Sequence, residues 1–116
     1  MAKLKNLEGK TALVTGAASG IGRALALELF YDRHCSLVLV DRDRIPLAEL
    51  AQQLDGHFHK KPGQHVVAIP CDVRSKRQID DVVSHLDQLD VLIHCAGLFY
   101  TGSFEHMDVA DFEAIV

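Results

Sequence analysis

The stretch TGAASGIG, residues 15–22, decides the fold because it joins two segments of different hydrophobic pattern. Residues 10–15 run into it and predict a buried strand, whereas residues 20–34 carry apolar side chains at helical spacing. The residues expected on the buried face of this helix are Ile21, Leu25 and Leu29. Glycines let the chain turn sharply at the joint, and the N–H groups that open the helix favour an anion. A strand, a glycine loop and a helix start in this order predict a phosphate-binding loop.

The alternation of strand and amphipathic helix continues along the chain. Further strands are expected at residues 35–40, 66–69 and 89–95. Helices are expected over residues 43–54 and 75–86, with a last one opening at Asp108. Asp43 is the expected cap of the first of these, and Ser75 with Gln78 forms a capping box for the second. This order predicts an α/β fold, a doubly wound parallel sheet of about four strands in the order 3-2-1-4.

Length and charge exclude several classes of protein. The 116 residues suit a single domain over residues 1–116. The net charge of −4, with no basic cluster longer than Lys60-Lys61, gives no support for nucleic-acid binding. The apolar runs are too short to span a bilayer, and residues 1–7 lack the apolar core of a secretory signal.

Cysteine and histidine spacing argues against disulfides and metal sites. The three cysteines are odd in number and lack a C-x-x-C pair, so we expect free thiols and a cytoplasmic setting. The cysteines are Cys35, Cys71 and Cys95. Neither His57 with His59 nor His94 with Cys95 has the spacing of a zinc site, so no metal is expected.

Four motifs in order resemble one family. They are TGxxxGxG at residues 15–22, Asp41 closing the second strand, Cys71-Asp72-Val73, and His94-Cys95-Ala96-Gly97. Together they resemble the short-chain dehydrogenase/reductase family, over the whole chain but only for the first half of a family member. The resemblance implies a truncated Rossmann-like fold. It also implies an NAD(P)-dependent oxidoreductase that transfers hydride between the nicotinamide and an alcohol or ketone.

The residues themselves indicate how such a cofactor would bind. The loop that holds Gly16, Gly20 and Gly22, with Ser19 and Ile21 between them, would cradle the pyrophosphate. Asp41 lies 19 residues after Gly22, where an acid accepts hydrogen bonds from the ribose hydroxyls. A carboxylate there repels a 2′-phosphate and favours NAD over NADP, although Arg42 would partly offset this. Ser19, which is not basic, also favours NAD.

The resemblance adds a second set of contacts. It implies that Asp72 hydrogen-bonds the adenine amino group, that Val73 packs on the adenine ring, and that Ala96 and Gly97 pass close to the cofactor ribose. Plainer interpretations stay open at this point. The glycine loop could be a turn without a ligand, Asp41 a solvated acid at the end of a strand, and Asp72 an ordinary turn residue.

Two features depart from the family pattern. His94 stands where the family usually has Asn, which ties neighbouring strands together, and a neutral His offers one donor and one acceptor for that role. The family's chemistry uses Ser, Asn and Tyr-x-x-x-Lys, but neither Tyr31 nor Tyr100 has Lys four residues later. Proton transfer to a carbonyl oxygen needs such an acid. The chain alone is therefore expected to be catalytically inactive, and no catalytic residue is assigned.

An alternative belongs to another class of function. The chain could be a non-catalytic nucleotide-binding or protein-interaction half-domain. Half of a doubly wound sheet leaves one edge of the fourth strand and the apolar face of the last helix uncovered. Such a chain would self-associate or bind a partner through these elements.

Overall fold

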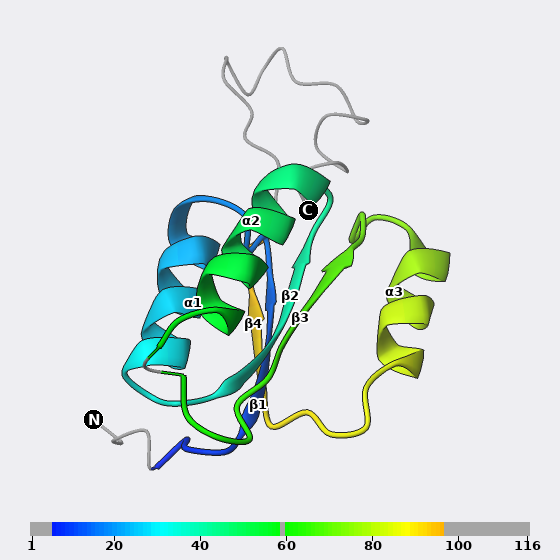
Figure 1. Cartoon of the computed structure of the whole chain (residues 1–116). Helices are drawn as coiled ribbons and strands as arrows, with labels where there is room; N and C mark the ends of the chain where they lie inside the picture. Colours follow the sequence, from blue (N-terminus) through cyan, green and yellow to red (C-terminus); the bar gives the residue numbers. More distant parts are fainter. Residues whose placement is uncertain (1–5, 59, 97–116) are drawn as a thin grey trace, which may run out of the picture.

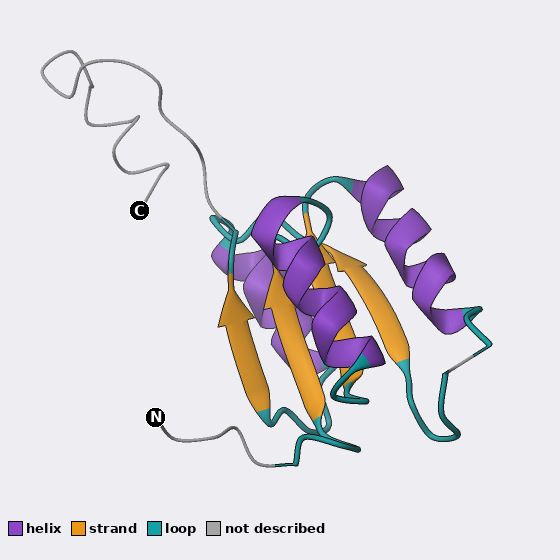
Figure 2. Cartoon of the chain, turned by 90° about the vertical axis from the view of Figure 1, so that its left-hand side faces the viewer, coloured by secondary structure: helices purple, strands orange, loops and turns teal. Residues whose placement is uncertain are grey.

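The computed structural model describes residues 6–58 and 60–96, which form three layers with a sheet in the middle (Figure 1). The strands are β1 (Thr11–Thr15), β2 (Ser36–Asp41), β3 (Val66–Pro70) and β4 (Val91–His94). The helices are α1 (Gly20–Tyr31), α2 (Arg44–Asp55) and α3 (Lys76–Ser84). Helices α1 and α2 cover one face of the sheet, and α3 lies on the other (Figures 1 and 2).

The sheet has the predicted order, β3-β2-β1-β4, and its three strand pairs are parallel. Thr15 at the end of β1 is in register with Val40 of β2 and His94 of β4. Asp41, the last residue of β2, is in register with Pro70 of β3. All four strands therefore end at one edge of the sheet, and the segments that follow them meet there.

The face under α1 and α2 holds the main core. It contains Val14, Leu37 and Leu39 from the sheet, with Phe30 from α1 and Leu54 from α2, each at most 1% exposed. Helix α2 is amphipathic as expected, since Leu47, Leu50 and Leu54 are buried and Ala51 is half-buried on the same side. Burying side chains of this size contributes about 1.5–3 kcal/mol each, so this face supplies most of the driving force for folding.

The buried face of α1 differs from the expected one. Ile21 is 74% exposed and Leu25 is only partly buried, so of the three expected residues only Leu29 is fully buried. Together with Leu29, the helix buries Gly22, Ala26 and Phe30. Gly22 faces inward, and its α-carbon lies against the carbonyl group of Gly16. A larger residue at position 22 would block this approach.

The face under α3 is thinly covered. Leu13, Val38 and Val40 of the sheet are buried with Cys71 and with Val82 of α3. Away from this cluster, three side chains lie largely open to solvent: Val67 at 50%, Val83 at 58% and Leu92 at 63%. Strand β4 therefore has one covered face and one exposed face.

Several expected boundaries shift for identifiable reasons. Helix α1 ends at Tyr31 rather than near residue 34, because His34 adopts a left-handed backbone conformation with φ of +58° that a helix cannot continue through. Strand β4 begins at Val91 rather than at residue 89, because the chain still turns at Asp90. The Asp90 carboxylate accepts a hydrogen bond from the Thr11 N–H at 2.9 Å, which braces that turn against β1.

The caps agree in part with the expectation. Ser75 accepts a hydrogen bond from the Gln78 N–H at 3.3 Å, as a capping box requires. Gln78 does not complete the box, because its side chain accepts from the Asp72 N–H instead. Asp43 stands at the N-cap position of α2 but makes no capping hydrogen bond with its side chain.

The helices of the described part of the chain are all too short or too polar to cross a membrane. The helix expected from Asp108 lies outside the described residues, as do Gly97 and His59. Cys35, Cys71 and Cys95 are free thiols, which confirms that expectation.

Candidate functional site

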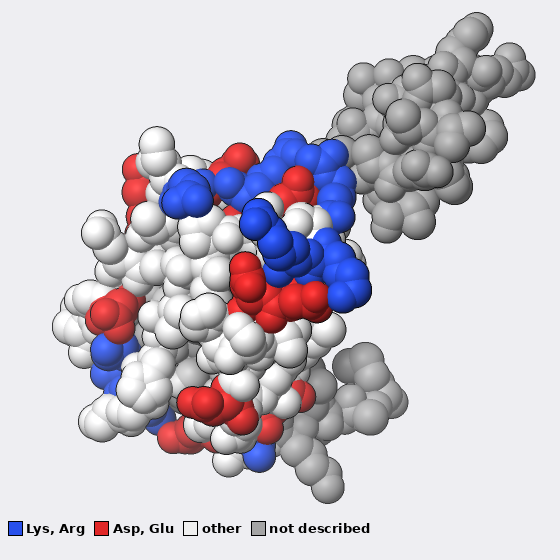
Figure 3. Space-filling view, turned by 90° about the vertical axis from the view of Figure 1, so that its right-hand side faces the viewer, with Lys and Arg blue, Asp and Glu red and all other residues white. Residues whose placement is uncertain are grey.

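The predicted site residues follow the carboxyl ends of the strands and gather at one edge of the sheet. The glycine loop joins β1 to α1, Asp41 ends β2, Asp72 follows β3, and Ala96 follows β4. In the space-filling view from the α3 side, basic side chains surround acidic ones at this end of the molecule (Figure 3). Ligands of doubly wound sheets bind at this edge, where loops on either side of the first strand diverge.

The three glycines of the loop do different things. A Cβ on Gly16 would lie 2.8 Å from the backbone of Cys95 and Ala96, so this glycine lets the chain after β4 approach the loop. A Cβ on Gly22 would lie 2.7 Å from the carbonyl carbon of Gly16, so this glycine lets α1 pack on the loop. Gly20, at φ of +58°, has no atom within 4 Å of a Cβ position. Gly20 alone of the three therefore faces open space.

The N-terminus of α1 is suited to an anion. Ser19 is its N-cap residue, in an extended conformation, and its side chain makes no capping hydrogen bond. The first N–H groups of a helix lack acceptors within the helix, so these donors are available to a ligand. Ser19, Gly20 and Ile21 are all exposed beside them. The loop thus offers open space at Gly20 and unused donors at the helix start, an arrangement that suits an anionic group.

Asp41 joins the glycine loop to the turn that leads into α2. Its Oδ2 accepts from the Ala18 N–H at 3.0 Å, and its Oδ1 accepts from the Asp43 N–H at 2.9 Å. The carboxylate is half-buried, and two bonds leave it lone pairs for further donors. Asp41 therefore braces the loop and keeps lone pairs for further donors, while Arg42 is exposed next to it.

Thr15 has a structural role beside the site that the sequence did not predict. It is 5% exposed, and its Oγ1 accepts from the N–H groups of Cys95 at 3.0 Å and Ala96 at 3.2 Å. The hydroxyl lies 2.8 Å from Nδ1 of His94. Because two N–H groups occupy its lone pairs, the hydroxyl donates its proton to Nδ1, which leaves the His94 proton on Nε2. The only signal in the sequence was the place of Thr15 at the start of the glycine motif.

His94 thus connects β4 to β1 by a side-chain hydrogen bond, although it replaces the usual Asn. Its ring is exposed, so this contact fixes the strand end without filling the core. Together with the bonds from Cys95 and Ala96, it holds the segment after β4 against the glycine loop. Ala96 and Val73 are half-buried at the same edge of the sheet.

Asp72 is held in an ion pair with Arg74. Nε and Nη2 of Arg74 lie 3.0 and 2.9 Å from the two carboxylate oxygens of Asp72, and the Arg74 N–H adds a third bond at 3.0 Å. These bonds to Arg74 lower the pKa of Asp72 from 3.8 to about 2. The carboxylate is therefore charged over the whole neutral range and stays partly accessible, with 30% of its side chain exposed.

This pKa predicts how stability depends on pH. A carboxyl group whose pKa falls on folding stabilises the folded state above its unfolded pKa, and that stabilisation is lost as pH falls through the folded value. For Asp72 the window runs from about pH 4 down to about pH 2. We expect Asp72→Asn to flatten the fall in melting temperature across this window. Thermal melts of both proteins followed by circular dichroism would check this, and parallel curves would contradict it.

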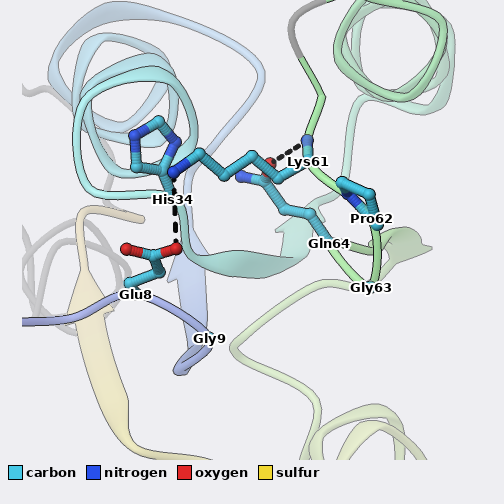
Figure 4. Close-up of a pocket in the computed structure, with 7 residues that line it drawn as sticks. All are labelled: Glu8, Gly9, His34, Lys61, Pro62, Gly63 and Gln64. Carbon is cyan, nitrogen blue, oxygen red and sulfur yellow. Dashed lines mark hydrogen bonds and ion pairs between the residues drawn. The ribbon is translucent and has the colours of Figure 1, made fainter.

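A cavity near the amino-terminal ends of the strands is separate from this site. It has a volume of about 380 Å³ and lies before the strands, among the segments that lead into β1, β2 and β3 (Figure 4). Its charged lining is paired, with Lys61 Nζ 3.3 Å from Glu8. The buried amide of Gln64 donates to the carbonyls of Phe30 and Cys35, both at 2.8 Å. These contacts hold the segments that line the cavity together, so we interpret the cavity as structural.

The fold and the site define a class, the doubly wound α/β proteins with a glycine loop after the first strand. Within it, residues 10–116 match the family model described as short chain dehydrogenase. The chain belongs to the short-chain dehydrogenase/reductase family, which confirms the resemblance read from its motifs.

Individual proteins similar to this chain are a dehydrogenase and a reductase by name. The chain is 32% identical over 114 residues to 2,3-dihydro-2,3-dihydroxybenzoate dehydrogenase of Bacillus subtilis, a match that covers 95% of this chain and 41% of the relative. The structure of L-sorbose reductase from Gluconobacter frateurii, complexed with NADPH and L-sorbose, matches with a TM-score of 0.80 at 28% identity, over 93% of this chain and 41% of that one.

A second solved structure holds the other form of the cofactor. It is 3-ketoacyl-(acyl-carrier-protein) reductase from Brucella melitensis complexed with NADH, with a TM-score of 0.78 at 27% identity, over 94% of this chain and 43% of that one. The chain therefore spans less than half the length of each of these three proteins.

Proposed function

We propose that this chain is the cofactor-binding half of an NAD(P)-dependent oxidoreductase that acts on an alcohol or ketone. The observation that carries the proposal is the uncapped start of α1 beside Gly20, at the same edge of the sheet as Asp41 and Asp72. A bound nicotinamide dinucleotide supplies hydride chemistry. The chain's own part is to bind it: the helix start takes the pyrophosphate, Asp41 the adenosine ribose and Asp72 the adenine. Val73, Ala96 and Gly97 complete the proposed contacts.

NAD is the proposed cofactor rather than NADP. A 2′-phosphate would meet the Asp41 carboxylate, and like charges at contact cost several kcal/mol in a recognition site. The Asp41 side chain is held by Ala18 and Asp43, so it has little freedom to turn away from the phosphate. Arg42 is exposed and reduces this penalty without removing it.

Replacement of Asp41 tests the site and the preference together. We expect the chain to bind NADH at least about tenfold more tightly than NADPH, and Asp41→Ala to lower that ratio about tenfold. Titration calorimetry with both cofactors gives the ratio, which is independent of any common loss of affinity from the missing Ala18 contact. Asp43→Ala is the matched control, because it removes the same charge two residues away. An unchanged ratio in Asp41→Ala would contradict the preference for NAD.

Catalysis is assigned to residues that this chain does not carry. The carbonyl oxygen of a ketone must be protonated as hydride arrives, and no tyrosine of this chain has the Tyr-x-x-x-Lys pattern. We infer that the chain by itself is inactive. Turnover of any alcohol or ketone by the purified chain with NAD would refute this inference. The free thiols also support a reducing, cytoplasmic setting as part of the proposal.

A second candidate function rests on β4. Within residues 6–58 and 60–96 this strand pairs only with β1, and Leu92 on it is 63% exposed. An edge strand with an exposed apolar side chain favours pairing with another strand. The occupant proposed is a second copy of this chain, joined edge to edge. Sedimentation velocity of wild type and Leu92→Lys tests this: dimers in wild type alone support it, and a monomeric wild type rejects it.

A further inference from the structure

Arg74 fixes the orientation of the Asp72 carboxylate. Its guanidinium approaches side-on, with Nε 3.0 Å from Oδ1 and Nη2 2.9 Å from Oδ2. The Arg74 N–H donates to Oδ1 as well, at 3.0 Å. A fork of this kind sets the plane of the carboxylate as well as its position, which a lysine cannot do. Both groups lie at the surface, with 49% of the Arg74 and 30% of the Asp72 side chain exposed.

The backbone under this ion pair is tied down on two sides. The Cys71 N–H donates to the carbonyl of Asp41 at 2.9 Å, which joins the segment to the end of β2. The Asp72 N–H donates to the side chain of Gln78 in α3 at 2.7 Å, and the Asp72 carbonyl accepts from the Ser75 N–H at 2.9 Å. Asp72 is therefore a fixed point between β2 and α3, and its carboxylate is fixed in turn by Arg74.

The hydrogen bonds leave one acceptor position open. An ionised carboxylate has about four lone-pair sites. In the described structure Oδ1 accepts two bonds, from Nε and from the N–H of Arg74, whereas Oδ2 accepts one, from Nη2. Oδ2 thus keeps a site for a single donor from a ligand, and the exposure of the side chain lets a ligand reach it.

We propose that Arg74 is a positioning residue that presents Oδ2 of Asp72 to the amino group of adenine and thereby sets base selectivity. The inference rests on the proposed function, since it requires the adenine to lie beside Asp72. An amino group donates one N–H to Oδ2, whereas a carbonyl oxygen in its place would face the carboxylate and be repelled. Arg74 contributes by keeping the carboxylate in this orientation before the ligand arrives, which lowers the entropic cost of recognition.

The test compares NADH with reduced nicotinamide hypoxanthine dinucleotide, in which a carbonyl oxygen replaces the adenine amino group. Cofactor fluorescence on titration with the 116-residue chain gives a Kd for each, and their ratio measures base selectivity. The variants are Arg74→Gln and Arg74→Lys, with Arg77→Gln as the control. Arg77 is an exposed arginine on the first turn of α3, so its loss changes the net charge equally. Circular dichroism melts verify that each variant is folded.

The expected result is a preference for NADH in wild type that falls about three- to tenfold in Arg74→Gln. Arg74→Lys should also lose selectivity, because an ammonium group cannot make the two-point contact, while Arg77→Gln should keep it. Unchanged selectivity in Arg74→Gln, or full selectivity in Arg74→Lys, overturns the role of Arg74 and leaves the cofactor site intact. A wild type that binds neither dinucleotide overturns the proposed function itself.

Discussion

Gly16→Ala is expected to lower the free energy of unfolding by about 2–5 kcal/mol and to abolish dinucleotide binding. Two causes add. Gly16 has a φ of +67°, where an L-residue with a Cβ is strained, and its Cβ would lie 2.8 Å from three backbone atoms of Cys95 and Ala96. Backbone cannot rotate away as a side chain can, so the segment after β4 must move off the loop.

Gly20→Ala separates the two causes. Gly20 has a similar φ of +58°, but its Cβ position is open. The substitution should cost only the conformational strain, about 1–2 kcal/mol. Urea unfolding of wild type and both variants, followed by circular dichroism, measures the difference. If both variants lost the same free energy of unfolding, the close contact of Gly16 with the segment after β4 would not contribute to the effect of Gly16→Ala.

Thr15→Val is expected to lower the free energy of unfolding by about 1–3 kcal/mol, although it keeps the shape of the side chain. The valine removes the acceptor for the Ala96 N–H and one of two acceptors for the Cys95 N–H, and it ends the bond to His94. The Cys95 N–H keeps the Thr15 carbonyl at 3.2 Å, which limits the loss.

Thr15→Ser is the matched control, because it keeps the hydroxyl and removes one methyl group. We expect it to cost about 1 kcal/mol. Urea unfolding compares the variants, and titration with NADH shows whether the chain after β4 still lies against the glycine loop. If Thr15→Val were as stable as Thr15→Ser, the hydroxyl would not be what holds these strand ends together.

The fold could be predicted from the sequence because its signals are local. The apolar runs at β1 and β2 and the stripe Leu47, Leu50, Leu54 in α2 depend on residues close together in the chain. The motifs identified the family for the same reason, since the glycine loop and Asp41 keep fixed distances from their strands. The strand order follows from alternation and handedness, which allow few arrangements.

The details that the sequence misjudged depend on tertiary contacts or on local backbone conformation, which hydrophobic periodicity does not show. Periodicity assigned Ile21 to the buried face of α1, but Gly22 lies there because of its approach to Gly16. The end of α1 and the start of β4 depend on the backbone of His34 and on the bond between Asp90 and Thr11, 79 residues apart. The spacing of residues along the sequence does not predict such contacts or conformations.

By itself, the sequence determined that this chain is a doubly wound α/β unit of the short-chain dehydrogenase/reductase family, because secondary structure and the glycine motif are written in neighbouring residues. Only the tertiary structure decided which contacts the described motif residues make within the chain. It separated the three glycines into two that admit backbone and one that faces open space. It also showed Thr15 holding the chain after β4, and Arg74 holding Asp72. The contacts of Gly16 and Thr15 join residues at the ends of different strands, which come together only when the chain folds. The sequence alone therefore does not show them.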